Sequence, residues 1–198
     1  MKLAMTGVLL AGGKSRRMGC DKAALTLGGQ TLAQRGINVL TEVFAEVVFS
    51  VGPGQDRLQA PSAVPIRAIE DRVPDQGPLG ALCSVLQAAK YDWIFLIACD
   101  MPFFTADGIR ALAQEIGAHS QIVVPEQGGR LHPLHAFYHR SALPAAEQAL
   151  QAGQRRMEAV LEACRTRIVS WEREGRRLTN VNTPADCAAI SGQEPSGE

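Results

Sequence analysis

Short apolar runs enriched in β-branched residues alternate along the chain with segments whose apolar residues recur at helical spacing. The runs predict strands at Thr6–Leu10, Val47–Val51, Ile66–Ile69, Trp93–Cys99, Ile122–Val124 and Ile168–Trp171. The helical stripes are Leu32, Ile37, Leu40, Val43 and Phe44, then Leu79, Leu82, Val85 and Leu86, then Ile109, Leu112 and Ile116. Because parallel neighbouring strands need long crossover connections, this alternation predicts an α/β fold with a largely parallel sheet and helices on both faces.

Local signals agree with this pattern at two helix starts. Pro78 suits the first turn of the second helix, and Thr105 and Asp107 can cap the third. In open sheets of this kind, ligands bind at the carboxyl ends of the strands. Polar residues that directly follow a strand are therefore the first candidates for a functional site.

The composition fits one compact domain. The chain has 198 residues and 46% apolar content, and its 20 basic residues balance 20 acidic ones. With no net charge to attract nucleic acid or anionic lipid, recognition of negative charge must be local. We expect a single domain over residues 1–190 and a loose tail over 191–198, whose composition is rich in Gly, Ser, Pro and Glu.

Neither a membrane segment nor a disulfide framework is indicated. The chain has no apolar stretch of 18 residues and no cleavage pattern near its start, which predicts a soluble cytoplasmic protein. The cysteines are widely spaced with no C-x-x-C pair, so reduced thiols are expected.

A glycine-rich, basic loop follows the first predicted strand. It reads Gly12-Gly13-Lys14-Ser15-Arg16-Arg17-Met18-Gly19-Cys20-Asp21-Lys22. Adjacent glycines permit backbone conformations closed to other residues, so successive N–H groups can turn toward phosphate oxygens. Four basic residues against one acidic residue suit a triphosphate. The spacing is neither a P-loop nor G-x-G-x-x-G, so a different phosphate-binding loop is indicated. The alternative is an ordinary glycine turn followed by a solvated basic stretch.

The stretch Leu10–Lys22 resembles the signature loop of molybdenum cofactor guanylyltransferases, the molybdopterin-guanine dinucleotide biosynthesis protein A family, within the Rossmann-like nucleotidyltransferases. Gly12 and Asp21 favour this branch, because related cytidylyltransferases and sugar-phosphate nucleotidyltransferases usually carry alanine at the first position and lack the acidic residue. The resemblance implies a nucleotide-binding role for Leu10, Ala11, Gly12, Gly13 and Lys22, and a catalytic role for Arg17 and Lys22.

A carboxylate follows the strand Trp93–Cys99 directly. Mg²⁺ in nucleotide enzymes is usually held by one or two carboxylates together with substrate phosphates. We therefore expect Asp100 to bind Mg²⁺, to contact the nucleotide and to take part in catalysis. The alternative is that Asp100 caps the helix expected near Thr105, but the intervening Pro102 makes it difficult for the carboxylate to reach the start of that helix.

Three further residues near strand ends are nucleotide or groove candidates. On its own Glu70-Asp71-Arg72 would more often be a solvated turn, but the resemblance places Asp71 in the nucleotide pocket. It also places Gly77 along the substrate groove. Ser50 aligns with the end of the second strand, where some relatives carry an asparagine that contacts the base. We therefore expect Ser50 beside the nucleotide. Because serine replaces the asparagine here, we expect backbone groups to recognise the base.

Three histidines in the second half invite a zinc hypothesis. His132, His135 and His139 would share a helical face, but Pro133 is poorly tolerated inside a helix and no nearby cysteine completes a zinc site. As an extended segment the run resembles the family's His-Pro strand beside the pterin. This resemblance implies that His132 contacts the second substrate.

The resemblance implies four more contacts to that substrate: Arg155, Arg156, Asn180 and Asn182. The arginines would form a basic helix start, although paired arginines are more often simply solvent-facing. The asparagine amides can donate and accept hydrogen bonds, although an isolated N-x-N would more often satisfy backbone groups.

The resemblance reaches from Leu9 to Asp186. It implies transfer of GMP from GTP to the terminal phosphate of molybdopterin or the molybdenum cofactor, with Mg²⁺ as cofactor and pyrophosphate as leaving group. The expected protein is a monomer that works with molybdenum insertion and delivery proteins. One alternative is a molybdopterin cytidylyltransferase or sugar-phosphate nucleotidyltransferase. Another is a non-catalytic carrier of nucleotide or molybdopterin.

Overall fold

The structure is a computed structural model that describes residues 1–10, 25–51, 66–71, 76–171, 178, 181 and 186. Its centre is one eight-stranded sheet in the order β10-β7-β9-β6-β1-β4-β5, with β8 paired to β7. The strands are β1 Leu3–Leu10, β4 Phe44–Val51, β5 Arg67–Glu70, β6 Trp93–Ala98, β7 Ile122–Gln127, β8 Arg130–Leu131, β9 His135–His139 and β10 Thr166–Ser170. All six predicted strands are present, with ends that differ by a few residues.

The sheet is largely parallel, as predicted. β1 pairs in parallel with β4 and β6, β4 with β5, and β7 with β10. β9 is the exception, because it runs antiparallel between β6 and β7. A separate two-stranded hairpin, β2 Thr26–Leu27 with β3 Gln30–Thr31, leads into the first helix.

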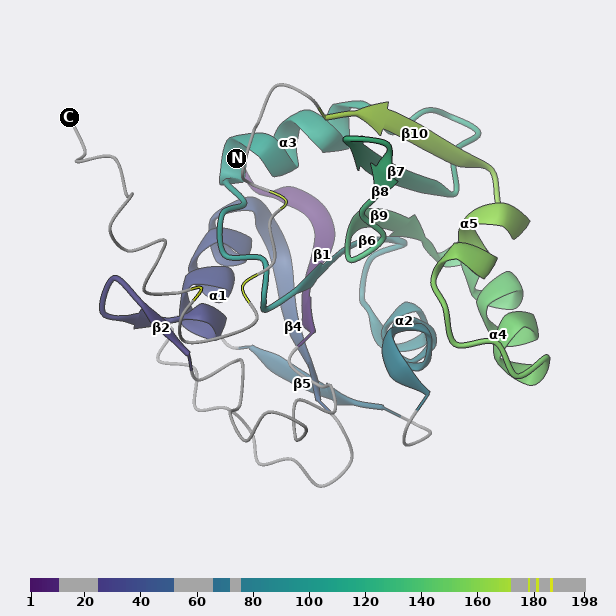
Figure 1. Ribbon diagram of the computed structural model, residues 1–198, viewed down its shortest axis with the longest axis horizontal. Coiled ribbons are helices and arrows are strands. Elements are labelled where there is room, and N and C mark those ends of the chain that lie inside the picture. Colours follow the sequence, from purple (N-terminus) through teal and green to yellow (C-terminus); the bar gives the residue numbers. More distant parts are fainter. Residues whose placement is uncertain are drawn as a thin grey trace.

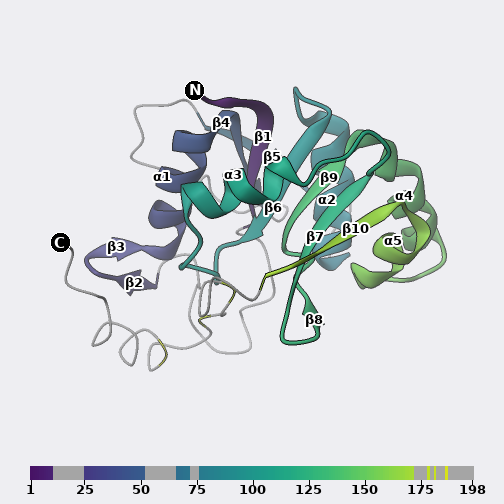
Figure 2. The same ribbon diagram turned by 90° about the horizontal axis from the view of Figure 1, so that it is seen from above.

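Helices cover both faces of the sheet, which confirms the predicted layers (Figure 1, Figure 2). α1 Leu32–Val43 and α3 Ala106–Gln114 pack on one face, around a core that includes Phe95 and Phe137. α2 Gly77–Ala88, α4 Leu143–Gln151 and α5 Glu158–Ala163 pack on the other, around a core that includes Val8 and Leu96. None of the helices in the described part of the chain is long and apolar enough to cross a membrane.

The helix starts follow the local signals with one difference. Pro78 lies in the first turn of α2, and the side chain of Thr105 caps α3 by accepting the N–H of Gly108 at 3.1 Å. Asp107 instead accepts a hydrogen bond from Arg110 on the exposed first turn, at 3.3 Å. Thr105 therefore caps α3 as predicted, whereas the Asp107 side chain binds Arg110 instead of the helix start.

Phe44 also departs from its prediction. It continues the helical stripe of α1 in the sequence, yet it ends that helix as the C-cap and begins β4. Its ring packs on Phe95 with 5.8 Å between centroids. Since α1 passes into β4 without a loop, one buried ring satisfies both the helical and the strand pattern.

The carboxyl ends of the parallel strands meet at one edge of the sheet. Leu10 pairs with Ser50 on one side and Ala98 on the other, and Val51 pairs with Glu70. We call the edge formed by these five residues the carboxyl edge. The ends of β7 and β10 and the beginning of β9 lie along the same edge, because β9 is antiparallel to β6 and to β7.

Candidate active site

Ser50 and Asp71 meet at the carboxyl edge, on neighbouring strands. Ser50 is buried near the end of β4, and its Oγ donates a hydrogen bond to Oδ1 of Asp71 at 3.1 Å. Asp71 follows β5 and donates its backbone N–H to the carbonyl of Val51 at 3.0 Å. The structure thus joins two residues that were predicted separately as nucleotide contacts.

The Asp71 carboxyl lies in a half-buried environment that disfavours its charge. Burial raises its pKa and the neighbouring Glu70 raises it further, whereas the hydrogen bond from Ser50 lowers it. Ser50 therefore favours the ionised carboxylate, which accepts hydrogen bonds and donates none. A fixed acceptor at this position can bind a ligand that presents N–H groups.

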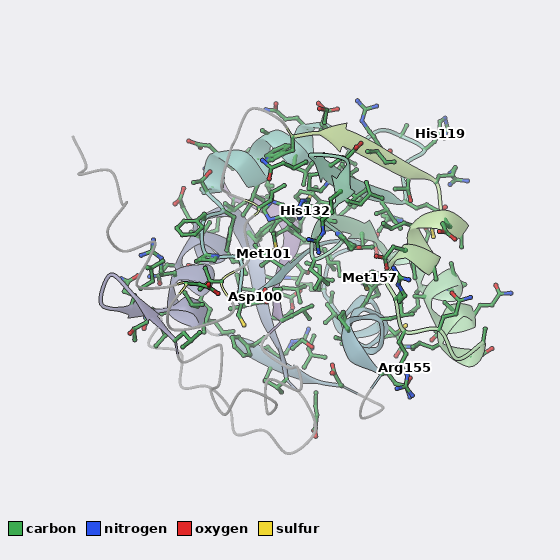
Figure 3. All side chains as sticks on the ribbon, in the orientation of Figure 1. Asp100, Met101, His119, His132, Arg155 and Met157 are labelled. Carbon is green, nitrogen blue, oxygen red and sulfur yellow. The ribbon has the colours of Figure 1, made fainter. Side chains whose placement is uncertain are left out.

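Asp100 lies one strand beyond β1, at the end of β6. The N–H of Cys99 donates to the carbonyl of Leu10 at 3.1 Å, which extends the β1–β6 pairing up to the residue before Asp100. The backbone carbonyl of Asp100 accepts the N–H of Val181 at 2.7 Å. Behind it, Met101 is buried in the core. Backbone hydrogen bonds on two sides thus fix the position of Asp100, a half-buried residue that Figure 3 labels.

Asp71 and Asp100 are too far apart to bind the same metal ion directly. They follow β5 and β6, which are three strand spacings apart in the sheet order, roughly 14 Å. Carboxylate oxygens bind Mg²⁺ at about 2.1 Å, so each carboxylate acts at a separate place. A ligand along the carboxyl edge would meet one carboxylate at each end.

The donor set at Asp100 fits a magnesium ion held largely by its substrate. Among the described residues, no group of three or more His, Cys, Asp or Glu side chains is placed to hold a metal. Mg²⁺ takes hard oxygen ligands and usually binds through one or two carboxylates plus phosphates and water. The Asp100 carboxylate supplies such a ligand at the carboxyl edge.

The segment before β9 lies beside the end of β6. The N–H of Ala98 donates to the carbonyl of Leu134 at 3.1 Å, and the N–H of His132 donates to the carbonyl of Pro125 at 3.0 Å. His132 is half-buried, and both burial and the charge of Arg130 lower its pKa, which favours the neutral ring at neutral pH. Figure 3 labels His132 in the same central part of the molecule as Asp100.

The other two histidines of this run have separate surroundings. His135 is buried, its ring meets Phe95 edge-on at 5.0 Å, and its Nδ1 has no hydrogen-bond partner among the described residues. Burial lowers the pKa of His135 to about 3. His139 lies at the far end of β9 against Trp93, with 5.1 Å between ring centroids. The run is not a helix, as Pro133 predicted: β9 spans His135–His139, and His132 lies before the turn that leads into this strand.

Gly77 and Arg155 come together at the start of α2. Gly77 has a φ of 64°, a conformation that favours glycine, and a Cβ there would lie 4.0 Å from the backbone oxygen of Arg155. The prediction that Arg155 and Arg156 form a helix start is wrong, because α5 begins at Glu158 and both arginines lie in the loop before it. Arg156 pairs with Glu158 at 3.6 Å, whereas Arg155 is exposed.

Several predicted residues lie outside the described part of the chain: Ala11, Gly12, Gly13, Arg17, Lys22, Asn180, Asn182 and the tail 191–198. Their described neighbours are informative. Leu10, which precedes the glycine-rich loop, ends β1 at the carboxyl edge. Val181, which stands between the two asparagines in the sequence, is buried and binds the carbonyl of Asp100.

Sequence reasoning missed Arg130, which lies in β8 two residues before His132. It follows a two-residue turn at Gly128 and Gly129, whose φ values are 58° and 75°. A Gly-Gly pair between extended residues is a hairpin signal and could have revealed this strand. No motif, however, marks a single arginine as functional.

Comparison with known proteins places the chain in a family. A model of the MobA-like NTP transferase domain matches residues 7–169. The chain is 35% identical over 191 residues to a "Probable molybdenum cofactor guanylyltransferase" of Pelotomaculum thermopropionicum, covering 93% of this chain and 90% of the relative. It is 30% identical over 190 residues to the "Molybdenum cofactor guanylyltransferase" of Vibrio cholerae, covering 95% and 92%.

The fold is shared with a solved structure of similar size. The molybdopterin-guanine dinucleotide biosynthesis protein A from Archaeoglobus fulgidus superimposes with a TM-score of 0.77 at 22% identity, covering 94% of this chain and 97% of that one. This likeness concerns the fold, whereas the matches in sequence concern the family. The matches in sequence show that the chain is a nucleotidyltransferase and belongs to the MobA-like NTP transferase family.

Proposed function

We propose that the protein transfers GMP from GTP to the terminal phosphate of molybdopterin or its molybdenum form, with release of pyrophosphate. The observation that carries the proposal is the row of residues along the carboxyl edge, where Leu10 lies between the Ser50–Asp71 pair on one side and the strand that delivers Asp100 on the other. The curated relatives that share most of the chain are named for this reaction.

The nucleotide half of the site lies over β1, β4 and β5. The Asp71 carboxylate, oriented by Ser50, is an acceptor for the N–H donors of a base. Guanine presents a ring N–H and an adjacent amino group, which a carboxylate can accept together. Cytosine has no such pair of donors, so this arrangement favours GTP over CTP.

The triphosphate would extend from this base site toward Asp100, past the glycine-rich loop that follows Leu10. Mg²⁺ held by Asp100 would neutralise charge on the phosphate oxygens. Arg17 and Lys22 would stabilise the charge that develops on the leaving pyrophosphate. Because the nucleophile is itself an anionic phosphate, the reaction needs no Ser-His-Asp group to activate it.

The second substrate would approach from the side of β9 and α2. A neutral His132 can donate one hydrogen bond and accept another, and Arg155 offers an exposed cation beside Gly77. Asn180 and Asn182 flank Val181, whose N–H binds the carbonyl of Asp100. We assign these residues and Arg156 to the pterin substrate. The protein would act in the cytoplasm as a monomer and pass its product to molybdenum insertion and delivery proteins.

Pyrophosphate release with molybdopterin, Mg²⁺ and each of GTP, CTP and UTP tests this proposal. We expect turnover with GTP at least tenfold above the others. Asp100→Asn should lower turnover by two or more orders of magnitude, whereas Asp107→Asn, an exposed position on α3, should not. Preferred turnover of CTP would indicate a cytidylyltransferase, and nucleotide binding without any pyrophosphate would indicate a carrier.

A further inference from the structure

The arginines of the described residues fall into two groups. Most form ion pairs with carboxylates or donate hydrogen bonds to backbone carbonyls: Arg35, Arg67, Arg110, Arg140, Arg156, Arg165 and Arg167. Arg130 and Arg155 have no such partner among the residues that the structure describes. Both are exposed and both lie toward the carboxyl edge. Arg155 is already a candidate contact of the second substrate, so the unexplained cation is Arg130.

Arg130 is held on a preformed hairpin. It pairs with Gln127 across the turn of Gly128 and Gly129, whose positive φ values match the tight turn that joins twisted strands. The N–H of Trp171 donates to the carbonyl of Glu126 at 2.8 Å, which fixes the other side of β7. Figure 2 shows this hairpin projecting at the side of the molecule opposite the N-terminus.

The hairpin places Arg130 on the side of β7 that faces Asp100. β10 occupies one side of β7 from Ile122 to Glu126, so β8 and β9 share the other side. The next strand beyond β9 is β6, which delivers Asp100. Adjacent strands are about 4.8 Å apart, so a long arginine side chain in this position can reach the space beside the end of β6.

Arg130 also acts on His132 electrostatically. Its positive charge adds to burial in lowering the pKa of His132, so the guanidinium and the imidazole lie close enough to interact. The positive charge of Arg130 beside a neutral His132 favours an anion in the space next to them. The planar guanidinium can bind two phosphate oxygens at once, which a lysine cannot.

We propose that Arg130 binds the terminal phosphate of the second substrate and holds it beside Asp100 for attack on the nucleotide. This inference rests on the proposed guanylyltransferase function. The nucleotide lies over β1, β4 and β5 in that proposal, so the attacking phosphate must come from the β9 side, where Arg130 stands. Arg130 offsets the repulsion between the two anionic substrates.

Equilibrium binding of molybdopterin to the full chain, measured without GTP, tests the assignment. Arg130→Gln keeps hydrogen-bonding capacity but removes the charge and the planar fork, and we expect molybdopterin to bind roughly tenfold to a hundredfold more weakly. Arg130→Lys should recover part of this loss. Arg110→Gln is the matched control, because Arg110 is a partly exposed arginine on α3 that pairs with Glu42.

Steady-state kinetics separate this role from a structural one. The KM for molybdopterin should rise in Arg130→Gln, while the KM for GTP stays at the wild-type value. Unchanged molybdopterin binding in Arg130→Gln would overturn the assignment, as would an equal loss of affinity for both substrates. Wild-type protein that binds molybdopterin but releases no pyrophosphate would refute the proposed function and leave the binding comparison to decide the role of Arg130.

Discussion

The hydroxyl of Ser50 donates a hydrogen bond to the carboxylate of Asp71, with 3.1 Å between Oγ and Oδ1. The bond joins the ends of two neighbouring parallel strands, β4 and β5, at the edge where Leu10 also ends. Ser50 is almost fully buried, so its hydroxyl has few alternative partners. The pair sets the position and the charge of an acceptor in the proposed base site.

Ser50→Ala should weaken GTP binding. The variant removes the hydrogen bond that, among the described residues, lowers the Asp71 pKa, so that pKa should rise and the carboxylate should lose its fixed orientation. A hydrogen bond to a charged group contributes about 1.5–3 kcal/mol, but solvent can replace part of it, so we expect the KM for GTP to rise about threefold to tenfold. The KM for molybdopterin should not change.

Ser84→Ala is the control for this effect. Ser84 is buried in α2 and donates to the carbonyl of Gly80 within the same helix. It should leave the GTP KM unchanged. Equal GTP KM values for wild type and Ser50→Ala would show that Asp71 does not read the base.

Lys22→Ala should impair the use of GTP. The lysine belongs to the basic loop after Leu10, and a charge-assisted hydrogen bond to phosphate is worth about 1.5–3 kcal/mol. We expect kcat/KM for GTP to fall roughly tenfold to a hundredfold. Lys2→Ala, an exposed lysine next to the start of β1, is the matched control. Kinetics like those of the wild type in Lys22→Ala would remove this residue from the mechanism.

Gly77→Ala should destabilise the fold. Gly77 begins α2 with a φ of 64°, where an alanine Cβ is strained whatever the space around it. The cost of this conformation is about 1–2 kcal/mol, and the free energy of unfolding in urea should fall by that amount. Gly117→Ala, an exposed glycine without a positive φ, should change stability by less than half as much. An unchanged urea midpoint for Gly77→Ala would contradict the strained conformation.

His135 should make the fold sensitive to mild acid. Burial lowers its pKa to about 3 in the folded protein, whereas the ordinary value is 6.5. Between these values the unfolded chain binds more protons, so the contribution is fully present above pH 6.5 and is lost as the pH falls toward 3. The expected slope is about 1.4 kcal/mol per pH unit within that window.

His135→Phe, which replaces the imidazole by an apolar ring, should remove this slope. The free energy of unfolding should be compared at pH 7.5 and pH 5.5 in the wild type, in this variant and in His119→Ala, which changes an exposed histidine. The difference between the two pH values should shrink in His135→Phe and stay as in the wild type in His119→Ala. A slope that persists in that variant would assign the acid sensitivity to other groups.

The strands and helices were largely predictable because their apolar residues face a core on one or both sides. Residues such as Val8 and Leu96 are fully buried, so their hydrophobic pattern is strict. Phe44 was assigned to a helix because a buried ring at the junction of α1 and β4 fits both periodicities. The antiparallel direction of β9 was not predictable, because the hydrophobic pattern of a short strand is the same in a parallel and in an antiparallel pairing.

The place of Asp100 in the fold was predictable because it follows a buried strand, β6, and parallel strands bring such ends to one edge. Asp71 follows the largely exposed strand β5, so the family resemblance and not the hydrophobic pattern pointed to it. The partnership of Ser50 with Asp71 depends on strand order, which the sequence pattern does not contain. Arg130 was missed for the same reason, because only the pairing of β8 and β9 with one side of β7 brings it toward Asp100.

Identification of the reaction product tests the central claim most directly. The protein should be incubated with molybdopterin, Mg²⁺ and GTP labelled at the α-phosphate, and the products analysed by mass spectrometry. The account predicts that the label appears in a guanine dinucleotide of molybdopterin, with one pyrophosphate per dinucleotide. Label that remains in GTP, or in free GMP without any dinucleotide, would contradict guanylyl transfer by this protein.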